Sequence, residues 1–260
     1  MSRDAHRRGA TNALSTVLRQ ERARRSILGA RLDDGRRQGC RDASAVSLQS
    51  SVAVEVGRAL GLRVGENPRR VTGGSINDAW RYDTERGPIF VKVSDLAAQE
   101  MFAAEADGLE ALASATAVRT PNVQATGSTH SHAWLALEWI DFAAETRGAE
   151  RMLGEALARQ HRVVGARYGW HRHNTIGSTQ QRNDWRDDWR DDWPSFLREH
   201  RLGFQLDLAL ARGARARVVD RGRRLCEGVS AFFKSYTPVP SLLHGDLWGG
   251  NWARLRPASR

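Results

Sequence analysis

Lysine is nearly absent from this basic chain, and cysteine is scarce. Of the 40 Lys and Arg residues in 260, only Lys92 and Lys234 are lysines. So strong an arginine bias is typical of a GC-rich coding sequence, and lysine is kept where a compact ammonium group is needed. The two cysteines, Cys40 and Cys226, lie outside CxxC and His-rich patterns, which predicts free thiols and disfavours a disulfide framework or a zinc site.

Long apolar runs are also missing. No window approaches 18 consecutive apolar residues, which excludes a membrane span, and no apolar run follows the arginines at positions 3, 7 and 8, which argues against a secretory signal. We therefore expect a cytoplasmic protein without a membrane partner. With 40% hydrophobic and 27% charged residues, the chain is long enough for one large or two small domains with a real core.

The net charge of +10 is unevenly distributed. The first 50 residues hold 11 Arg and 5 acidic residues, whereas the other 210 hold 29 basic and 25 acidic residues. We interpret residues 1–51 as a poorly ordered, Arg-rich extension. Because clustered arginines release counterions from a phosphate backbone, nucleic-acid binding by this arm is an alternative. The nearly balanced main body does not favour nucleic acid as the partner.

From residue 52 the pattern is that of a folded domain. Strands are predicted at residues 78–83, 88–93 and 133–140, the first two joined by a turn at residues 85–87. Residues 165–181 are expected to be loop-like. Helices are predicted at residues 52–60, 97–115, 151–164, 194–210 and 215–233.

The motif HGDLWGGN near the end of the chain carries the strongest local chemistry. Asp246 follows His244 by two positions and precedes Asn251 by five, which is the spacing of the kinase catalytic loop. There the Asp accepts the proton of the attacking hydroxyl and the Asn oxygen binds Mg²⁺. Since Gly, Asp and Asn are also common turn residues, an ordinary turn is the alternative.

Lys92 ends the strand IFVK, which resembles the kinase strand whose lysine meets nucleotide phosphates and a helix Glu. Glu105 lies 13 residues later on the apolar stripe of the predicted helix, with Phe102, Leu109 and Leu112. A carboxylate on a packed face needs a partner, which predicts a Lys92–Glu105 ion pair within about 4 Å. The turn at Gly73 and Gly74 could bring backbone N–H groups to phosphates, although a plain hairpin turn explains it equally well.

Several segments together resemble the fructosamine (ketosamine) kinase family. They are VTGGSINDAWRY, GPIFVKV, MFAAEADGLEAL, LALEWI, GWHRHNTIGSTQQRNDW and LLHGDLWGGN, and the likeness runs from about residue 52 to residue 253. The resemblance implies an α+β, protein-kinase-like bilobal fold. We expect a β-rich N-lobe at residues 52–140 and a truncated helical C-lobe at residues 141–260 that carries the catalytic loop.

The resemblance also implies a reaction and its residues. The family transfers the γ-phosphoryl group of ATP, with Mg²⁺, to a sugar hydroxyl of a small or protein-borne ketoamine. It implies the following roles: phosphate binding by Lys92, Gly73 and Gly74, with Glu105 as the anchor of Lys92; an adenine-facing hinge of Glu138, Trp139 and Ile140; Asp246 as catalytic base; and Asn251 as Mg²⁺ ligand.

The chain departs from the family pattern in two places. Only nine residues follow Asn251, whereas the family continues through a second metal-binding Asp and further helices. A C-terminally truncated, poor kinase is therefore expected, and a noncatalytic nucleotide-binding remnant is the alternative. Residues 184–192 also contain a tandem WRDD repeat. Finally, His171 and His173 are predicted to be surface residues and not metal ligands.

Overall fold

A computed structural model describes residues 35–71, 77–143, 147–177, 179–183 and 192–255. The chain divides into two units, Met1–Leu48 and Gln49–Arg260. In the first unit the described residues, 35–48, form the start of helix α2 (Gly35–Leu60). The helix begins before the expected start at Val52, so the described part of the predicted extension is helical. Gly73, Gly74 and most of the WRDD repeat lie outside the described residues.

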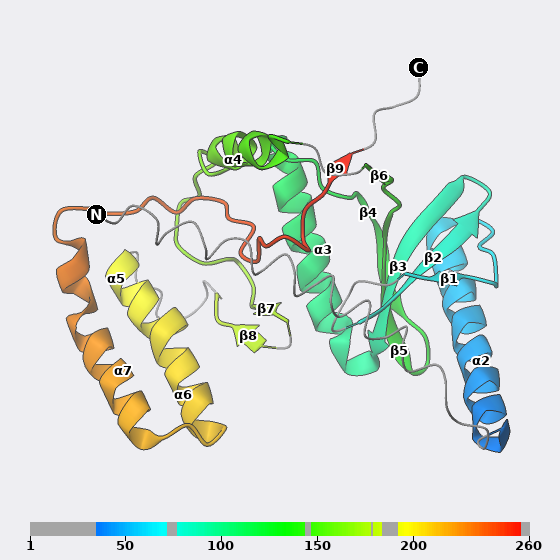
Figure 1. The fold of residues 1–260 in the computed structure, drawn as a ribbon, viewed down its shortest axis with the longest axis horizontal. Coiled ribbons are helices and arrows are strands. Elements are labelled where there is room, and N and C mark those ends of the chain that lie inside the picture. Colours follow the sequence, from blue (N-terminus) through cyan, green and yellow to red (C-terminus); the bar gives the residue numbers. More distant parts are fainter. Residues whose placement is uncertain (1–34, 72–76, 144–146, 178, 184–191, 256–260) are drawn as a thin grey trace, which may run out of the picture. The chain divides into compact units, whose positions relative to one another are not determined.

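The second unit begins with the end of α2 and continues with an antiparallel sheet in the order β1-β2-β3-β5-β4 (Figure 1). The strands are β1 (Arg69–Arg70), β2 (Asp78–Thr84), β3 (Gly87–Asp95), β4 (Val123–Ser128) and β5 (His132–Glu138). The three strands predicted from the sequence are confirmed. Strand β4 was not predicted, because its sequence VQATGS contains Gly and Ser and only one large apolar side chain.

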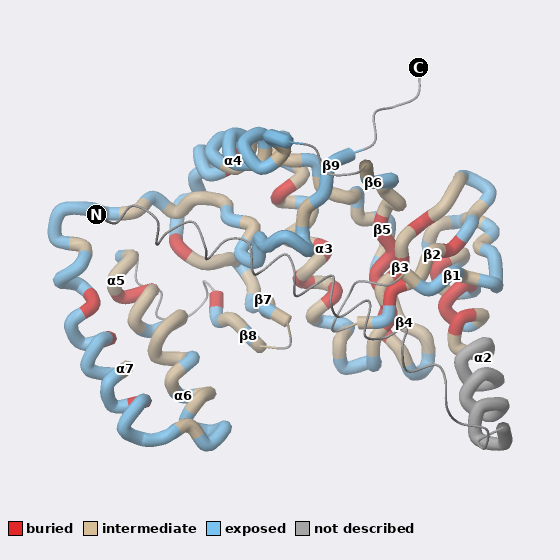
Figure 2. The backbone as a smooth tube through the Cα atoms, viewed as in Figure 1, coloured by how far each residue is buried: buried red, intermediate tan, exposed pale blue. Residues whose placement is uncertain are grey.

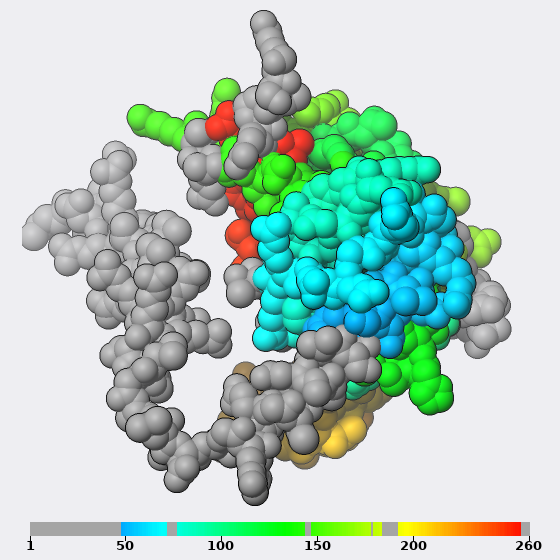
Figure 3. Space-filling model, turned by 90° about the vertical axis from the view of Figure 1, so that its right-hand side faces the viewer, coloured from blue at the N-terminus to red at the C-terminus, as the bar shows by residue number. Residues whose placement is uncertain are grey.

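Two helices pack on the sheet from opposite sides (Figure 1). Helix α3 (Gln99–Ser114), reached through the 3₁₀ turn Leu96–Ala98, buries Phe102 and Ala106 against apolar side chains of β5. On the other side, the fully buried Tyr82 donates from its hydroxyl to the backbone oxygen of Gln49 in α2, at 3.3 Å. Buried residues accordingly concentrate along the sheet and α3 (Figure 2). Figure 3 shows the end of α2, from residue 48, beside the first strands on one face.

The strand register decides which side chains face α3. Lys92 pairs with Ala79 on β2 and with Leu135 on β5, and residues paired across antiparallel strands point to the same face. Leu135 belongs to the cluster that packs around Phe102. Lys92 therefore lies on the face of the sheet that α3 covers, while its neighbours Val91 and Val93 are buried on the other face.

The rest of the unit is mainly helical. It contains the helices α4 (Ala149–Gln160), α5 (Trp193–Phe196), α6 (Phe204–Ala211) and α7 (Ala216–Gly228), the π-helical turn Leu197–Gly203 and the 3₁₀ turn Val229–Phe233. They are accompanied by one short hairpin, β7 (Asn174–Ile176) with β8 (Thr179–Gln181), and by an antiparallel pair of strands distant in the sequence, β6 (Phe142–Ala143) with β9 (Arg254–Leu255). Cys226 is a buried free thiol in α7, as predicted.

One expectation for this half was wrong, and a second was confirmed with a local difference. Residues 165–181, expected to be loop, contain the β7–β8 hairpin. The helix expected over residues 194–210 is present, but its middle is the π-helical turn, where a Cβ on Gly203 would lie 2.7 Å from the backbone oxygen of Arg198. A side chain at that position would not fit, so glycine permits the wider turn. Among the described residues, no helix has the length and apolar character needed to cross a membrane.

Candidate nucleotide and phosphoryl-transfer site

The predicted ion pair is present. The ammonium nitrogen of Lys92 lies 2.5 Å from Oε1 of Glu105, and both side chains are about 70% buried, with 28% and 30% exposed. Lys92 projects from the middle of β3, whose backbone is fixed by β2 on one side and β5 on the other. The strand register and the contact with Glu105 thus orient the ammonium group of Lys92 on the face of the sheet that α3 covers.

Helix α3 sets the position of Glu105. Its neighbours Phe102, Ala106 and Leu112 are buried, so the helix is pinned to the sheet by its apolar stripe. Glu105 lies on the edge of that stripe, where it reaches Lys92 without being fully withdrawn from water. A partly buried charge is costly unless it is paired, so the carboxylate of Glu105 and the ammonium group of Lys92 stabilise each other here.

The side chain of Glu138, at the end of β5, is engaged by the loop before β4. Arg119 donates to Oε1 of Glu138, and the backbone N–H of Asn122 donates to Oε2 at 3.1 Å. Burial raises the pKa of Glu138, but these two hydrogen bonds and the Arg119 charge outweigh it, so the pKa lies below its ordinary value. Both carboxylate oxygens of Glu138 are therefore engaged within the protein.

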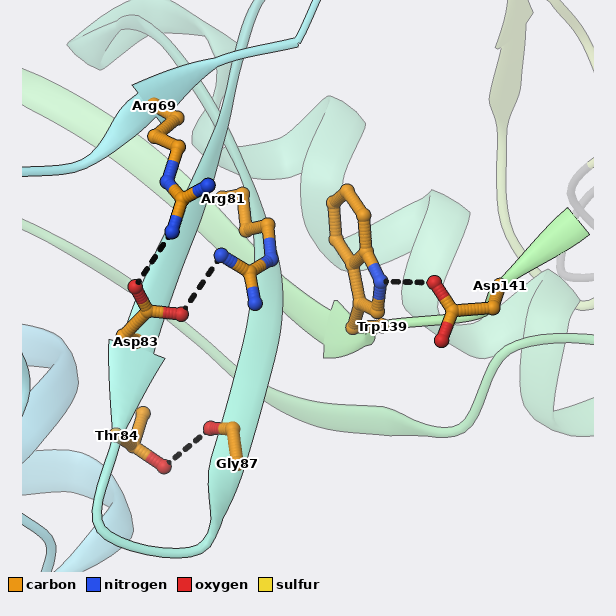
Figure 4. A network of polar contacts seen from close by, with 7 residues as sticks. All are labelled: Arg69, Arg81, Asp83, Thr84, Gly87, Trp139 and Asp141. Carbon is orange, nitrogen blue, oxygen red and sulfur yellow. Dashed lines mark hydrogen bonds and ion pairs between the residues drawn. The ribbon is translucent and has the colours of Figure 1, made fainter. Parts of the chain in front are cut away.

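Trp139 is held between two charged residues (Figure 4). Its indole Nε1 donates to Asp141 at 3.0 Å, and the guanidinium of Arg81 lies 5.2 Å from the ring centroid, within cation–π range. Arg81 is itself oriented by an ion pair with Asp83 at 2.8 Å, and Asp83 also meets Arg69 at 3.6 Å. Strand β2 is in this way tied to the segment that follows β5.

Asp246 and Asn251 lie against each other in the HGDLWGGN loop. The side-chain amide of Asn251 donates to the backbone oxygen of Asp246 at 2.8 Å and to its carboxylate at 3.0 Å. Gly245 has a φ of +83°, a left-handed conformation that favours glycine at this position. Asp246 and Asn251 are exposed, so the carboxylate is open to a reactant.

Backbone contacts on both sides of the loop fix its course. Before it, Gly165 donates to Pro240 at 2.8 Å and Leu242 donates to Val163 at 2.9 Å. After it, β9 pairs with β6, which begins two residues after Ile140. The chain beyond Asn251 is therefore paired with the segment beyond the predicted hinge.

The structure brings the predicted residues together as two contacting pairs, Lys92 with Glu105 and Asp246 with Asn251. In the part of the chain that is described, no three His, Cys, Asp or Glu residues gather as a metal-binding group. Sequence reasoning missed Arg119 as the partner of Glu138. It also missed Asp107, whose carboxylate lies 3.1 Å from the ring of the half-exposed His171. The sequence signal for the Asp107 contact was the GWHRHN segment, which contains His171 and is one of the segments that carry the family resemblance.

Comparisons with known proteins point to one family. The family model described as fructosamine kinase matches residues 51–259. A probable ketoamine kinase of Synechocystis is 38% identical over 192 residues, which cover 72% of this chain and 61% of that protein. A chloroplastic protein-ribulosamine 3-kinase of Arabidopsis thaliana is 38% identical over 186 residues, covering 70% of this chain and 56% of that protein. The chain thus spans little more than half the length of these relatives.

Solved structures show the same fold. A Haemophilus somnus protein assigned as a fructosamine-3-kinase superposes with a TM-score of 0.68 at 26% identity, over 79% of this chain and 68% of that chain. A Thermobifida fusca protein with the same assignment superposes with a TM-score of 0.66 at 27% identity, over 79% of this chain and 69% of that chain. The predicted protein-kinase-like α+β fold is confirmed.

Proposed function

Because the chain belongs to the fructosamine kinase family, we propose that it acts in the ATP-dependent phosphorylation of a sugar hydroxyl on a ketoamine. The observation that carries the proposal is the Lys92–Glu105 ion pair at 2.5 Å on the covered face of the sheet. The Asp246–Asn251 contact adds a carboxylate and an amide oxygen at kinase spacing.

Lys92 is the proposed contact to the ATP phosphates. Phosphoryl transfer depends on positioning and on neutralisation of phosphate charge, and a lysine ammonium is a compact charge suited to both. Glu105 would restrict the four-carbon stem of Lys92 to one direction, which lowers the entropy lost when phosphate binds. Gly73 and Gly74 are proposed to cover the phosphates with backbone N–H groups, and the backbone of residues 138–140 is proposed to face adenine.

Asn251 fits the role of a Mg²⁺ ligand by its donor chemistry. Its amide nitrogen is committed to Asp246, which leaves the side-chain oxygen as the atom for a hard cation. Mg²⁺ is commonly held by one or two protein oxygens together with phosphates and water. When bound, the ion would neutralise charge on the β- and γ-phosphates.

Asp246 is the proposed general base. An ionised carboxylate only accepts hydrogen bonds, so it can orient the sugar hydroxyl and take its proton. The hydroxyl oxygen then bonds to the γ-phosphorus, the bond between that phosphorus and the bridging oxygen of ADP breaks, and the proton goes to Asp246. The exposure of Asp246 favours an acceptor that is either a small ketoamine or one carried on a protein.

The test is phosphate transfer from Mg²⁺-ATP to a fructosamine and to a ribulosamine by the 260-residue chain, and by a fusion that adds the C-terminal part of the Synechocystis relative. Asp246→Asn, which keeps shape but loses the base, should abolish transfer and leave ATP affinity within about twofold. Asp220→Asn, an exposed acid in α7, is the matched control and should transfer phosphate normally.

Other outcomes of this test would support an alternative function or refute the proposal. ATP binding without transfer in both proteins would favour the nucleotide-binding alternative, and no ATP binding at all would refute the proposal. Deleting residues 1–48 should not change ATP affinity. DNA binding that depends steeply on salt and disappears on that deletion would instead support a nucleic-acid function of the arm.

A further inference from the structure

Three consecutive residues that follow α4, at positions 170–172, contact side chains of helix α3. Nε1 of Trp170 donates to Oδ2 of Asp107 at 2.5 Å, and Nε2 of His171 lies 3.1 Å from Oδ1 of the same carboxylate. Arg172 forms an ion pair with Glu100 at 2.9 Å. Segment 170–172 is therefore attached to α3 by consecutive side chains, with both oxygens of Asp107 occupied.

These attachments lie along one stripe of α3. Glu100 and Asp107 are seven residues apart, which at about 100° per residue places them on nearly the same face, two turns apart along the axis. Glu105 and Asp107 are separated by about 200° around the axis. Lys92 and segment 170–172 therefore hold the helix from nearly opposite sides, and a rotation of α3 that releases one contact displaces the other.

Segment 170–172 is itself anchored in the helical half. The backbone N–H of Trp170 donates to the carbonyl of Asn183, a residue only 2% exposed. Asn183 donates from Nδ2 to Asn174 at 2.6 Å and receives Arg201 at its Oδ1, at 2.5 Å. Burial lowers the pKa of Arg201 to about 10, so the guanidinium stays charged near neutral pH. The π-helical turn that carries Arg201 thus supports the segment that grips α3.

We propose that Asp107 is a positioning residue, which through Trp170 and His171 fixes α3 at the rotation that lets Glu105 reach Lys92. The inference rests on the proposed function, because it gives Lys92 the task of binding phosphate. The contacts of Asp107 are with Trp170 and His171, and it is not among the residues proposed to meet ATP, Mg²⁺ or the sugar. It links the helical half to the Lys92–Glu105 pair through the hydrogen bonds of Trp170 and the backbone of α3.

The chemistry of the contact separates this role from simple packing. Asp107 is 27% exposed and buries little apolar surface of its own, so its truncation leaves the Phe102 core intact. Trp170→Phe removes only the N–H donor and part of the ring. Glu110, exposed on the same helix, offers a control that touches neither anchor.

The experiment uses the scarcity of lysine. An amine-reactive N-hydroxysuccinimide ester labels Lys92 and Lys234, and mass spectrometry gives the rate at Lys92 relative to the exposed Lys234 in the same molecule. Glu105→Gln should raise the relative rate by about fivefold, because it removes the ion pair. Asp107→Ala and Trp170→Phe should raise it toward that value, and Glu110→Ala should not.

A double variant distinguishes positioning from general loosening. If Asp107 acts through Glu105, the Glu105→Gln, Asp107→Ala protein should be labelled no faster than Glu105→Gln alone. Labelling of both Asp107→Ala and Trp170→Phe at the parental rate, or an equal rise in Glu110→Ala, would overturn the inference. Thermal unfolding identifies variants that fail to fold. If Asp107→Ala fails to fold, the labelling rate of Trp170→Phe decides the test. Labelling needs no nucleotide, so its result stands apart from whether the chain binds ATP or transfers phosphate.

Discussion

Replacing Glu105 with Gln should weaken ATP binding without unfolding the protein. Gln keeps the length of the side chain and one oxygen that can accept from Lys92, but it removes the negative charge. Lys92 would then lose its fixed direction, because among the described residues no other carboxylate lies within ion-pair distance of its ammonium group. The substitution therefore tests the negative charge of the Glu105 carboxylate alone.

The expected size follows from the geometry of that pair. A hydrogen bond between charged groups contributes about 1.5–3 kcal/mol when withdrawn from water, and an exposed ion pair contributes about 1 kcal/mol or less. Lys92 and Glu105 are 28% and 30% exposed, which places them between these limits. A loss of about 1–2 kcal/mol corresponds to a fall in ATP affinity of about 5- to 30-fold.

The assay is calorimetric titration with Mg²⁺-ATP, beside Glu110→Gln as a control of the same chemistry on the exposed face of α3. A double-mutant cycle with Lys92→Met completes it, since Glu105→Gln should have little further effect once the lysine is gone. Two results would refute the reasoning. One is parental ATP affinity in Glu105→Gln, and the other is an undiminished effect of that change in the Lys92→Met background.

Three further outcomes are expected. Gly127→Ala should lower the free energy of unfolding by about 1–3 kcal/mol in urea titrations, because the added Cβ would overlap the buried ring of Trp134; equal stability would contradict this packing. Burial raises the pKa of Glu138, but Arg119 and the backbone N–H of Asn122 lower it by more, so the folded-state pKa lies below the ordinary value of 4.5. The contribution of Glu138 to stability is therefore present above that value and is lost as pH falls through the lower, folded-state pKa. Glu138→Gln should flatten this acid limb of the stability curve, and an unchanged limb would argue against the pair. Phe232, 71% exposed, should promote self-association, so Phe232→Ser should lower the apparent mass in concentrated samples by light scattering; no change would show that this side chain is not a contact.

The sequence alone was sufficient for the contacts that follow from local periodicity. The Lys92–Glu105 pair was predictable because a strand fixes which face Lys92 takes, and a helical stripe fixes where Glu105 points. The strands at residues 78–83 and 88–93 and the helix that follows were predictable for the same reason. Asp246 and Asn251 lie in one short loop, so their spacing already limited how far apart they could be.

Only the tertiary structure decided the contacts between distant segments. Arg119 with Glu138 and Asp107 with Trp170 join residues 19 and 63 positions apart, and no local pattern specifies which charge meets which. Strand β4 is an edge strand that depends on its pairing with β5, since its own sequence, VQATGS, has little β-branched or aromatic character. The π-helical turn depends on where Gly203 meets the backbone of Arg198. Periodicity reports the face that a residue takes on its own element, whereas the partner on that face is set by the packing of the whole chain.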